Sequence, residues 1–368
     1  MRVKLAGEVK NLDIDSVLGK REAKKMDRFT QFALIAAQQA MDDSGLDREG
    51  EDLSRCGVIC SSGIGGFETV SEAHRRGESR GYDSVSPFVI PMIISNMAAG
   101  QIAIRFGFQG MCTCVVTACA GGTNAVGDAF RHIRDGYAEV MLCGGTEASI
   151  TPMSIGGFTS MKALTQNPDP KRASIPFDAE RSGFVLGEGA AILLLEELEH
   201  AKARGARILA EVVGYGATCD AYHMTAPRPD GSGAAKAMEM ALADGGAKPE
   251  DVDYINAHGT STPLNDAGET AAVKTVFGDH AYKLAISSTK SMTGHMLGAA
   301  GAIEALACLK ALNEGVLPPT INLLDPDPAC DLNYVPNQAI HTEVDLVLSN
   351  SLGFGGHNAC IAFRKVTR

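Results

Sequence analysis

Two stretches of the chain repeat one pattern, and this repeat restricts the fold more than any other feature of the sequence. Residues 114–127 read as an apolar strand, a tight turn and a helix of small residues (CVVTACAGGTNAVG), and residues 286–301 read in the same way (ISSTKSMTGHMLGAAG). The reactive residues of the two turns, Cys119 and His295, are 295 − 119 = 176 positions apart. The repeat predicts two similar halves joined near residue 205. Alternatively, the small residues only allow close packing of helix on sheet.

Short apolar runs alternate with alanine-rich stretches along the whole chain. The apolar runs precede glycine clusters and lie at 57–60, 140–143 and 344–349, whereas helical stretches are expected at 29–41, 234–243 and 299–312. Strands that alternate with helices are typical of an α/β protein with mostly parallel, buried sheets.

Composition excludes several classes of function. Apolar residues make up 45% of the chain and the net charge is −11, which is an ordinary globular profile and argues against non-specific nucleic-acid binding. The longest apolar stretch, 190–195, is too short for membrane insertion. The ten cysteines lack zinc spacing, and no signal peptide is evident, so we expect reduced thiols, no metal site and a cytoplasmic protein.

Cys119 follows an apolar strand at the point where a helix is predicted to begin. Backbone N–H groups and the positive end of the helix dipole favour a thiolate at such a position. The small neighbours Ala118, Ala120, Gly121 and Gly122 leave the sulfur accessible and permit a sharp turn, as in a nucleophile elbow. The alternative is an inert cysteine of the core.

Two of the nine histidines lie where strands end. His258 follows the run Tyr-Ile-Asn-Ala, and His295 precedes the second helix of small residues. Ligands of open α/β sheets bind at the carboxyl ends of the strands, so both are candidate site residues, although a structural histidine is the default for either. Five other histidines have charged or polar neighbours and are expected on the solvated surface: His74, His132, His200, His280 and His341.

Several motifs resemble those of the β-ketoacyl-[acyl-carrier-protein] synthases, and in particular the type II condensing enzymes of bacterial fatty-acid synthesis. They occur in the order found in that family, between Leu5 and Val366. The motifs are TACAG at 117–121, PFDAERSGFVLGEG at 176–189, NAHGTST at 256–262, STKSMTGH at 288–295, PPTIN at 318–322 and GFGG at 353–356.

The resemblance implies a thiolase-like fold, which is a five-layered α-β-α-β-α sandwich of two similar halves and usually forms a homodimer. The halves are expected at 1–205, with the nucleophile, and at 206–368, with the histidine pair. Relative to the family, the segment before Leu5 lacks a leading strand and helix, which would leave apolar neighbours and backbone groups of the first half uncovered.

The resemblance also implies a reaction, namely acyl transfer to Cys119 followed by decarboxylative condensation with malonyl-[acyl-carrier protein]. His258 and His295 would donate Nε2–H bonds to the malonyl thioester carbonyl. Lys290 would belong to the catalytic set, and Glu304 would be its buried charge partner.

The turn that contains Phe354 corresponds to the oxyanion hole and to a gate for the extender. The N–H groups of Cys119 and Phe354 would form the hole, and Gly353 and Gly355 would allow the gate to move. On the other interpretation, 353–356 is only a tight turn between strands. His357 stands where the family usually has threonine, so the resemblance does not fix gating or chain-length preference.

A basic cluster in this acidic chain matches the carrier-docking region of the family and consists of Lys20, Arg21, Lys24, Lys25 and Arg28. Acyl carrier proteins are acidic, so complementary charge would raise the association rate. Arg105, Lys171 and Arg172 are weaker candidates, and a solvated helix face is the alternative. The expected partners are acyl- and malonyl-[acyl-carrier protein].

No cofactor is expected on the enzyme itself, because phosphopantetheine arrives on the carrier and decarboxylation drives the reaction. No nucleotide-binding glycine motif is present. The alternatives within the same fold are a polyketide ketosynthase, a non-catalytic partner subunit and a thiolase. The partner subunits usually lack the cysteine, and for the second cysteine of thiolases Cys360 is out of register.

Overall fold

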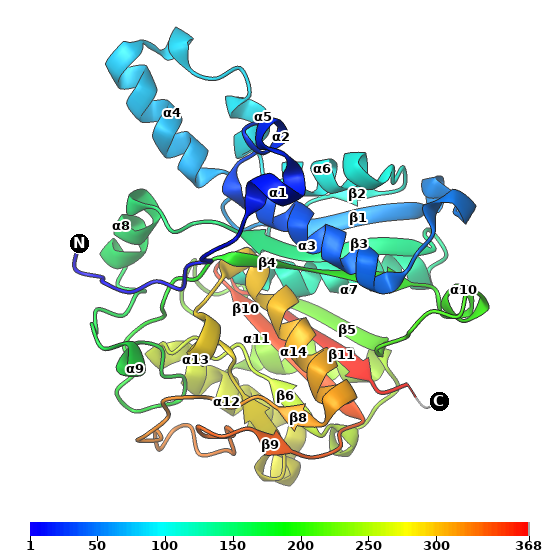
Figure 1. Cartoon of the computed structure of the whole chain (residues 1–368). Coiled ribbons are helices and arrows are strands. Elements are labelled where there is room, and N and C mark those ends of the chain that lie inside the picture. Colours follow the sequence, from blue (N-terminus) through cyan, green and yellow to red (C-terminus); the bar gives the residue numbers. More distant parts are fainter. Residues whose placement is uncertain (367–368) are drawn as a thin grey trace.

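Helices and strands alternate in layers in the computed structural model, which describes residues 1–366 (Figure 1). The first sheet has the order β2-β1-β3-β4, and the second has the order β5-β11-β10-β6-β7. The strands of the first sheet are β1 (Cys56–Ser61), β2 (Cys112–Thr113), β3 (Val140–Glu147) and β4 (Gly189–Glu196). Those of the second are β5 (Glu211–Cys219), β6 (Tyr254–Asn256), β7 (Ala285–Ser287), β10 (Leu346–Gly353) and β11 (His357–Arg364). A small third sheet pairs β8 (Val316–Leu317) with β9 (Ile340–His341).

The long helices cover both sheets and also fill the space between them (Figure 1). Outside the first sheet lie α3 (Arg28–Ser44) and α6 (Met97–Phe106), between the sheets lie α7 (Gly121–Arg134) and α14 (Ala300–Glu314), and outside the second sheet lie α11 (Ser232–Asp244) and α12 (Pro263–Phe277). The remaining helices are α1 (Ile14–Leu18), α2 (Lys20–Ala23), α4 (Phe67–Arg80), α5 (Val89–Ile93), α8 (Pro152–Ser160), α9 (Pro170–Ala173), α10 (Leu198–Ala203) and α13 (Lys290–Thr293). This arrangement confirms the α/β prediction of five alternating layers.

Three apolar cores follow from these layers. Along β1, Val58 and Cys60 belong to the core under α3 and α6, whereas Ile59 belongs to the central core with α7 and α14. Successive side chains of a strand point to opposite faces, so a continuous apolar run such as that of β1 is required where both faces of a sheet are covered. The third core lies between the second sheet and α11 and α12.

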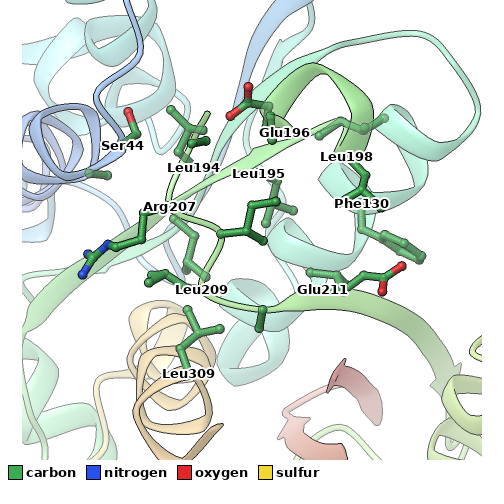
Figure 2. Close-up of a pocket in the computed structure, with 18 of the residues that line it drawn as sticks. Ser44, Phe130, Leu194, Leu195, Glu196, Leu198, Arg207, Leu209, Glu211 and Leu309 are labelled. Carbon is green, nitrogen blue, oxygen red and sulfur yellow. The ribbon is translucent and has the colours of Figure 1, made fainter. Parts of the chain in front are cut away.

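The two sheets correspond strand by strand, with one difference. The order β2-β1-β3-β4 matches β7-β6-β10-β11, and the last pair is antiparallel in both sheets. In addition, β11 pairs antiparallel with β5 on its far side, whereas within residues 1–366 β4 pairs only with β3. A groove of about 470 Å³ runs along this open edge of β4 (Figure 2). Leu194 and Leu195 are half-buried there, while the equivalent part of β11 is fully buried.

Within residues 1–366 no helix is both long and apolar enough to cross a bilayer. All ten cysteines are free, and seven of them are buried.

Candidate active site

Cys119 lies in a sharp turn between β2 and α7. Ala118 has a left-handed backbone (φ +49°), and a turn of 3₁₀ helix over 118–120 leads directly into α7. Small residues are required here, because a Cβ on Gly121 would lie 2.0 Å from the hydroxyl of Ser61. The sequence therefore predicted the turn correctly, and we call residues 118–120 the nucleophile elbow.

A second turn of the same shape precedes α14. Leu297 has φ +47°, and the 3₁₀ turn over 297–299 leads into α14 in the same way. This second elbow (residues 297–299) places Gly298 at the position equivalent to Cys119, which is 298 − 119 = 179 residues away. The repeat is real, but the spacing of 176 predicted from the sequence was wrong. His295 lies three residues before the equivalent position.

The turn between β10 and β11 (residues 353–356), which we call the gate turn, covers the nucleophile elbow. It is a tight turn between antiparallel strands, with Gly355 at φ +87° and Gly356 at φ +77°. A Cβ on Gly353 would lie 3.1 Å from the backbone nitrogen of Cys119, and the backbone N–H of Phe354 is directed at the Cys119 sulfur. The backbone N–H of Phe354 therefore lies near the sulfur, and Gly353 packs against the backbone nitrogen of Cys119.

His258 has a defined tautomer. It is 2% exposed and follows β6, and its Nδ1 lies 3.3 Å from the Nζ of Lys290. An ammonium group can only donate, so Nδ1 accepts and the ring proton of the neutral imidazole is on Nε2. Burial and the charge of Lys290 lower the pKa of His258 well below its usual value. His258 is therefore a neutral donor through Nε2.

His295 lies edge-on to His258, with ring centroids 5.3 Å apart. Its backbone is held by the bridge to Leu186, and the ring of Phe184 packs edge-on against it at 5.1 Å. Phe184 also belongs to the apolar cluster that contains Cys119, and so this ring connects the nucleophile with the histidine pair. Burial, followed by the charge of Lys290, lowers the pKa of His295 well below its usual value.

Lys290 and Glu304 form a fully buried ion pair behind the histidines. Burial raises the pKa of Glu304 to about 7, although the Lys290 charge opposes that rise. The pairing expected from the sequence is present, and Lys290 serves both Glu304 and His258.

Burial opposes ionisation of the Cys119 thiol. The residue is 7% exposed, and burial raises its pKa to about 12, while the Lys290 charge and the Phe354 N–H act in the opposite direction. The expectation from the helix dipole alone omitted this burial, which also makes the sulfur less accessible than the small neighbours suggested.

Two buried carboxylates support the site and were missed in the sequence. Glu269 of α12 accepts the backbone N–H groups of His258 (2.8 Å) and Gly259 (2.9 Å), and burial raises its pKa to about 6. Glu147, at the end of β3, accepts the N–H of Gly298 at 3.0 Å. Only the position of Glu147 after an apolar strand could have indicated it.

The basic cluster divides into exposed and engaged residues. Lys20, Arg21 and Lys24 are exposed on and beside α2. Lys25 pairs with Glu22, whereas the guanidinium of Arg28 pairs with the buried Glu188. Arg28 also donates to the Val9 carbonyl and stacks on Phe32. Arg28 therefore has a structural role, contrary to the docking expectation.

The weaker docking candidate Arg172 is likewise engaged, since it pairs with the buried Asp178. Arg105, another weaker docking candidate, donates a long hydrogen bond of 3.5 Å to the side chain of Gln38.

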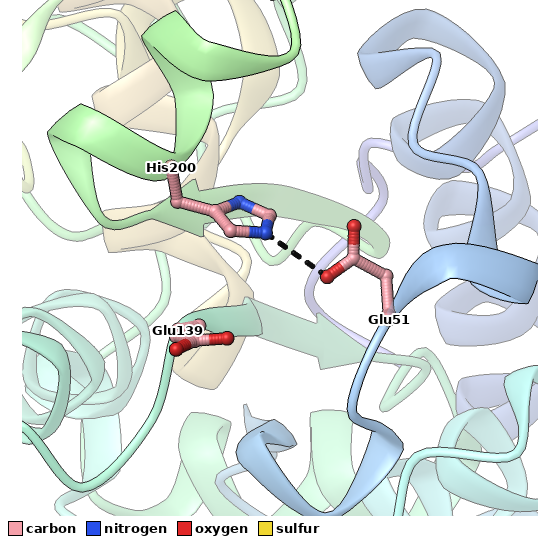
Figure 3. A group of neighbouring side chains, drawn as sticks. All are labelled: Glu51, Glu139 and His200. Atoms are coloured by element: carbon pink, nitrogen blue, oxygen red, sulfur yellow. Dashed lines mark ion pairs between the residues drawn. The ribbon is translucent and has the colours of Figure 1, made fainter.

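His200 was predicted to lie on the solvated surface, and this prediction is wrong. Its Nε2 pairs with Glu51 at 3.1 Å and its Nδ1 with Glu196 at 2.6 Å, and Glu139 lies close by (Figure 3). Glu139 in turn pairs with Arg55. Both ring nitrogens are occupied by these contacts, so the group forms an ion-pair network on the first half.

Comparisons with known proteins agree with this geometry. The family models described as "Beta-ketoacyl synthase, N-terminal domain" and "Beta-ketoacyl synthase, C-terminal domain" match residues 12–201 and 209–324. The 3-oxoacyl-[acyl-carrier-protein] synthase 2 of Synechocystis sp. is 55% identical over 363 residues, which are 98% of this chain and 87% of that protein. The protein of the same name from Staphylococcus aureus is 51% identical over 99% of this chain and 88% of its own length.

Two solved structures are similar to the whole chain. A ketosynthase in complex with its type II polyketide acyl-carrier protein has a TM-score of 0.92 and 39% identity, covering 99% of this chain and 89% of that one. A β-ketoacyl synthase from Burkholderia phymatum has a TM-score of 0.92 and 34% identity, covering 100% and 89%. The thiolase-like architecture predicted from the sequence is therefore confirmed.

Proposed function

Since the chain belongs to the β-ketoacyl synthase family, we propose that it condenses an acyl group held on Cys119 with malonyl-[acyl-carrier protein] to give 3-oxoacyl-[acyl-carrier protein]. The observation that carries this proposal is the neutral, Nε2-protonated His258, paired with His295 and locked by Lys290. A pair of neutral donors suits an enolate, because it stabilises the oxygen without supplying a proton to the carbanion.

The first step transfers the acyl group from the pantetheine sulfur of the carrier to Cys119. The thiol proton of Cys119 leaves with the departing pantetheine sulfur, so the exchange is neutral overall. The negative charge of the tetrahedral intermediate forms on the acyl oxygen, which the N–H groups of Cys119 and Phe354 stabilise. The Phe354 N–H beside the sulfur and the packing of Gly353 against the Cys119 nitrogen support this assignment.

The second step breaks the bond between the malonyl carboxylate and its α-carbon. His258 and His295 donate Nε2–H bonds to the thioester oxygen while CO₂ leaves and the electron pair moves into an enolate. The enolate carbon then attacks the acyl thioester, the tetrahedral adduct expels the Cys119 sulfur as a thiolate, and the thiolate takes one proton from solvent. Losing one such donor typically costs about 3–4 kcal/mol of transition-state stabilisation.

Fatty-acid synthesis is the assigned pathway, because the relatives with higher identity carry the name 3-oxoacyl-[acyl-carrier-protein] synthase 2. The polyketide ketosynthases among the structural neighbours are the second candidate. The two differ in product, since a fatty-acid enzyme releases its chain after one extension. A non-catalytic partner subunit is disfavoured, because Cys119, His258 and His295 are all present in one buried site.

An acidic acyl carrier protein is the partner that suits the exposed cations at α2, and its phosphopantetheine arm would be the only prosthetic group in the reaction. Reversing Lys20 and Lys24 to glutamate should raise KM for the carrier several-fold with kcat within twofold. Lys236→Glu, an exposed change on α11, is the control. An unchanged KM in the double variant would reject this docking site.

A homodimer and a cytoplasmic location complete the proposal. Within residues 1–366, β2 pairs only with β1, so its other edge is open. Exposed apolar residues lie before, beside and after this strand, namely Ile104, Met111 and Val116. An open edge with apolar neighbours is suited to pairing with a second copy. We take 1–205 and 206–368 as the two halves of each subunit.

Acyl transfer to Cys119 is tested by incubating the protein with a long-chain acyl carrier protein and analysing its peptides by mass spectrometry. The adduct should appear on Cys119 alone. Cys119→Ala should lose condensation but retain some malonyl decarboxylation, whereas Cys143→Ala, a change of another buried cysteine, should retain both. Condensation by Cys119→Ala would overturn the proposal.

A further inference from the structure

The correspondence between the two sheets extends to the ends of their central strands. Strand β10 ends at Gly353, which faces the nucleophile elbow, with its Cβ position 3.1 Å from the nitrogen of Cys119. Strand β3 is the equivalent of β10 and ends at Glu147, whose Oε2 accepts the N–H of Gly298 at 3.0 Å. Glu147 thus occupies, at the second elbow, the place that the gate turn occupies at the nucleophile elbow.

Glu147 accepts five hydrogen bonds from three segments of the chain. Three come from the turn after β1, namely the N–H of Gly63 (2.8 Å), the N–H of Ile64 (3.3 Å) and the hydroxyl of Ser62 (3.2 Å). The others come from the hydroxyl of Ser149 (2.9 Å) and from Gly298. Backbone N–H groups can only donate, so Gly63, Ile64 and Gly298 favour an ionised carboxylate, to which the two serine hydroxyls can also donate.

Burial makes this arrangement costly unless all five bonds are formed. Glu147 is 0% exposed, and within residues 1–366 it takes part in no ion pair. Burial raises its pKa, and the hydrogen bonds from Gly63 and Gly298 oppose that rise. The charge is therefore held by directed N–H and O–H groups together with the amino end of α14, which fixes the carboxylate tightly.

The segments that Glu147 joins are parts of the active site. Ile64 and Leu297 pack in the apolar cluster that contains Cys119. A Cβ on Gly122, at the start of α7, would lie 3.0 Å from the Gly298 carbonyl, so the two elbows are in direct contact. Gly298 is three residues from His295, and a shift of the second elbow would displace that ring relative to the sulfur.

We propose that Glu147 is a positioning residue for condensation, because its carboxylate fills the second elbow with a permanent anion and so fixes His295 relative to Cys119. This inference rests on the proposed function. Acylation needs only the nucleophile elbow and the gate turn, whereas condensation also needs the two histidines correctly placed relative to Cys119. The role of Glu147 therefore predicts unequal effects on the two steps.

The test is Glu147→Gln, which keeps the size of the side chain but turns an NH₂ group toward the donors. Acylation of Cys119 is measured in a single turnover, and condensation is measured with malonyl carrier protein. The ratio of condensation to acylation should fall on the order of 100-fold relative to wild type. Alkylation of Cys119 should also shift to lower pH, because a nearby negative charge is removed while Lys290 and Glu304 remain.

Three further variants separate positioning from a general structural role. Asp27→Asn changes another buried carboxylate, whose hydrogen-bond partners Thr69 and Phe29 lie outside both elbows, and should leave the ratio unchanged. Glu147→Asp keeps the charge, but its side chain is too short to make the same hydrogen bonds. The pH dependence of Cys119 alkylation should therefore return toward that of wild type, while the ratio of condensation to acylation stays low. Ser149→Ala removes one donor and should lower the ratio roughly fivefold.

An unchanged ratio overturns the inference. If Glu147→Gln fails to fold, Ser149→Ala decides the question by the same ratio. If the wild-type protein forms no adduct on Cys119, the proposed function fails instead, so the two failures can be told apart.

Discussion

Replacing Lys290 with methionine should destabilise the protein, and the loss should depend on pH. Lys290 is 1% exposed, pairs with Glu304 and donates to Nδ1 of His258. Methionine keeps the length of the side chain but leaves the Glu304 carboxylate buried without a cation. Removing one partner of a buried ion pair typically costs about 3–5 kcal/mol of unfolding free energy.

The pH dependence follows from the pKa of Glu304, which is about 7 in the folded protein against an ordinary value of 4.5. A carboxyl group with a raised folded pKa contributes its full stability below the unfolded pKa and loses it as pH rises through the folded pKa, at about 1.4 kcal/mol per pH unit. Between pH 6 and pH 8 wild type loses about 1.4 kcal/mol through this group, because Glu304 is half ionised near pH 7 and almost fully ionised at pH 8.

Without the Lys290 charge, the pKa of Glu304 should rise to about 8 or above, as is known for buried glutamates. Lys290→Met would then lose about 2.3–2.7 kcal/mol through Glu304 over the same interval. The destabilisation relative to wild type should therefore be about 1 kcal/mol larger at pH 8 than at pH 6. Urea unfolding at the two pH values measures this difference directly.

A second substitution serves as the control. In Lys290→Met with Glu304→Gln, no ionised carboxylate remains at this position, so the extra loss at pH 8 should disappear. Condensation should stay low, because Nδ1 of His258 still lacks its donor. Equal destabilisation by Lys290→Met at pH 6 and pH 8 would refute the reasoning, since it would mean that the Lys290 charge does not affect the pKa of Glu304.

Three further predictions concern other parts of the fold. Pairing with Glu196 raises the pKa of His200, so His200→Gln should cost about 0.5–1 kcal/mol at pH 5.5 and little at pH 9, as measured by thermal unfolding at each pH. Backbone amides of β4 should exchange with deuterium faster than those of β11, because β11 is paired on both sides. Gly355→Ala should cost about 1–2 kcal/mol in urea unfolding, since residue 355 has φ +87°.

The layers and both elbows could be predicted from the sequence because they depend on local patterns. Apolar runs bounded by glycine form the strands, and small residues mark both turns, since a side chain at Gly121 or at Gly298 would clash with neighbouring segments. The register of the repeat could not be predicted in the same way. Reactive residues suggested that Cys119 corresponds to His295, whereas backbone geometry pairs Cys119 with Gly298.

The electrostatics of the site depended on contacts between distant segments. The helix start suggested a thiolate at Cys119, but burial by side chains such as Phe184 and Leu297 outweighs the backbone dipoles. In the sequence Arg28 belongs to the basic cluster proposed to bind the carrier protein, but in the structure it pairs with Glu188, which is 160 residues away. Such pairs have no local signature, so charge patterning along the chain could not assign them.

The two elbows show how one structural unit can serve two purposes. Each presents backbone N–H groups at the start of a helix, where an anion is stabilised. At the second elbow Glu147 supplies a permanent anion, so that elbow is fixed and carries no reaction. At the nucleophile elbow the corresponding strand ends in Gly353 and Phe354, which bring no charge of their own.

An oxyanion hole is useful only if its donors become available when the intermediate forms. A carboxylate at position 353 would occupy the N–H groups near Cys119 and repel the developing negative charge on the acyl oxygen. A glycine at position 147 would leave the N–H of Gly298 buried without an acceptor, which costs about 1–3 kcal/mol. Glutamate at one strand end and glycine at the equivalent end therefore suit the two elbows to different tasks, and Gly298 in place of the Cys119 thiol leaves the second elbow without a nucleophile.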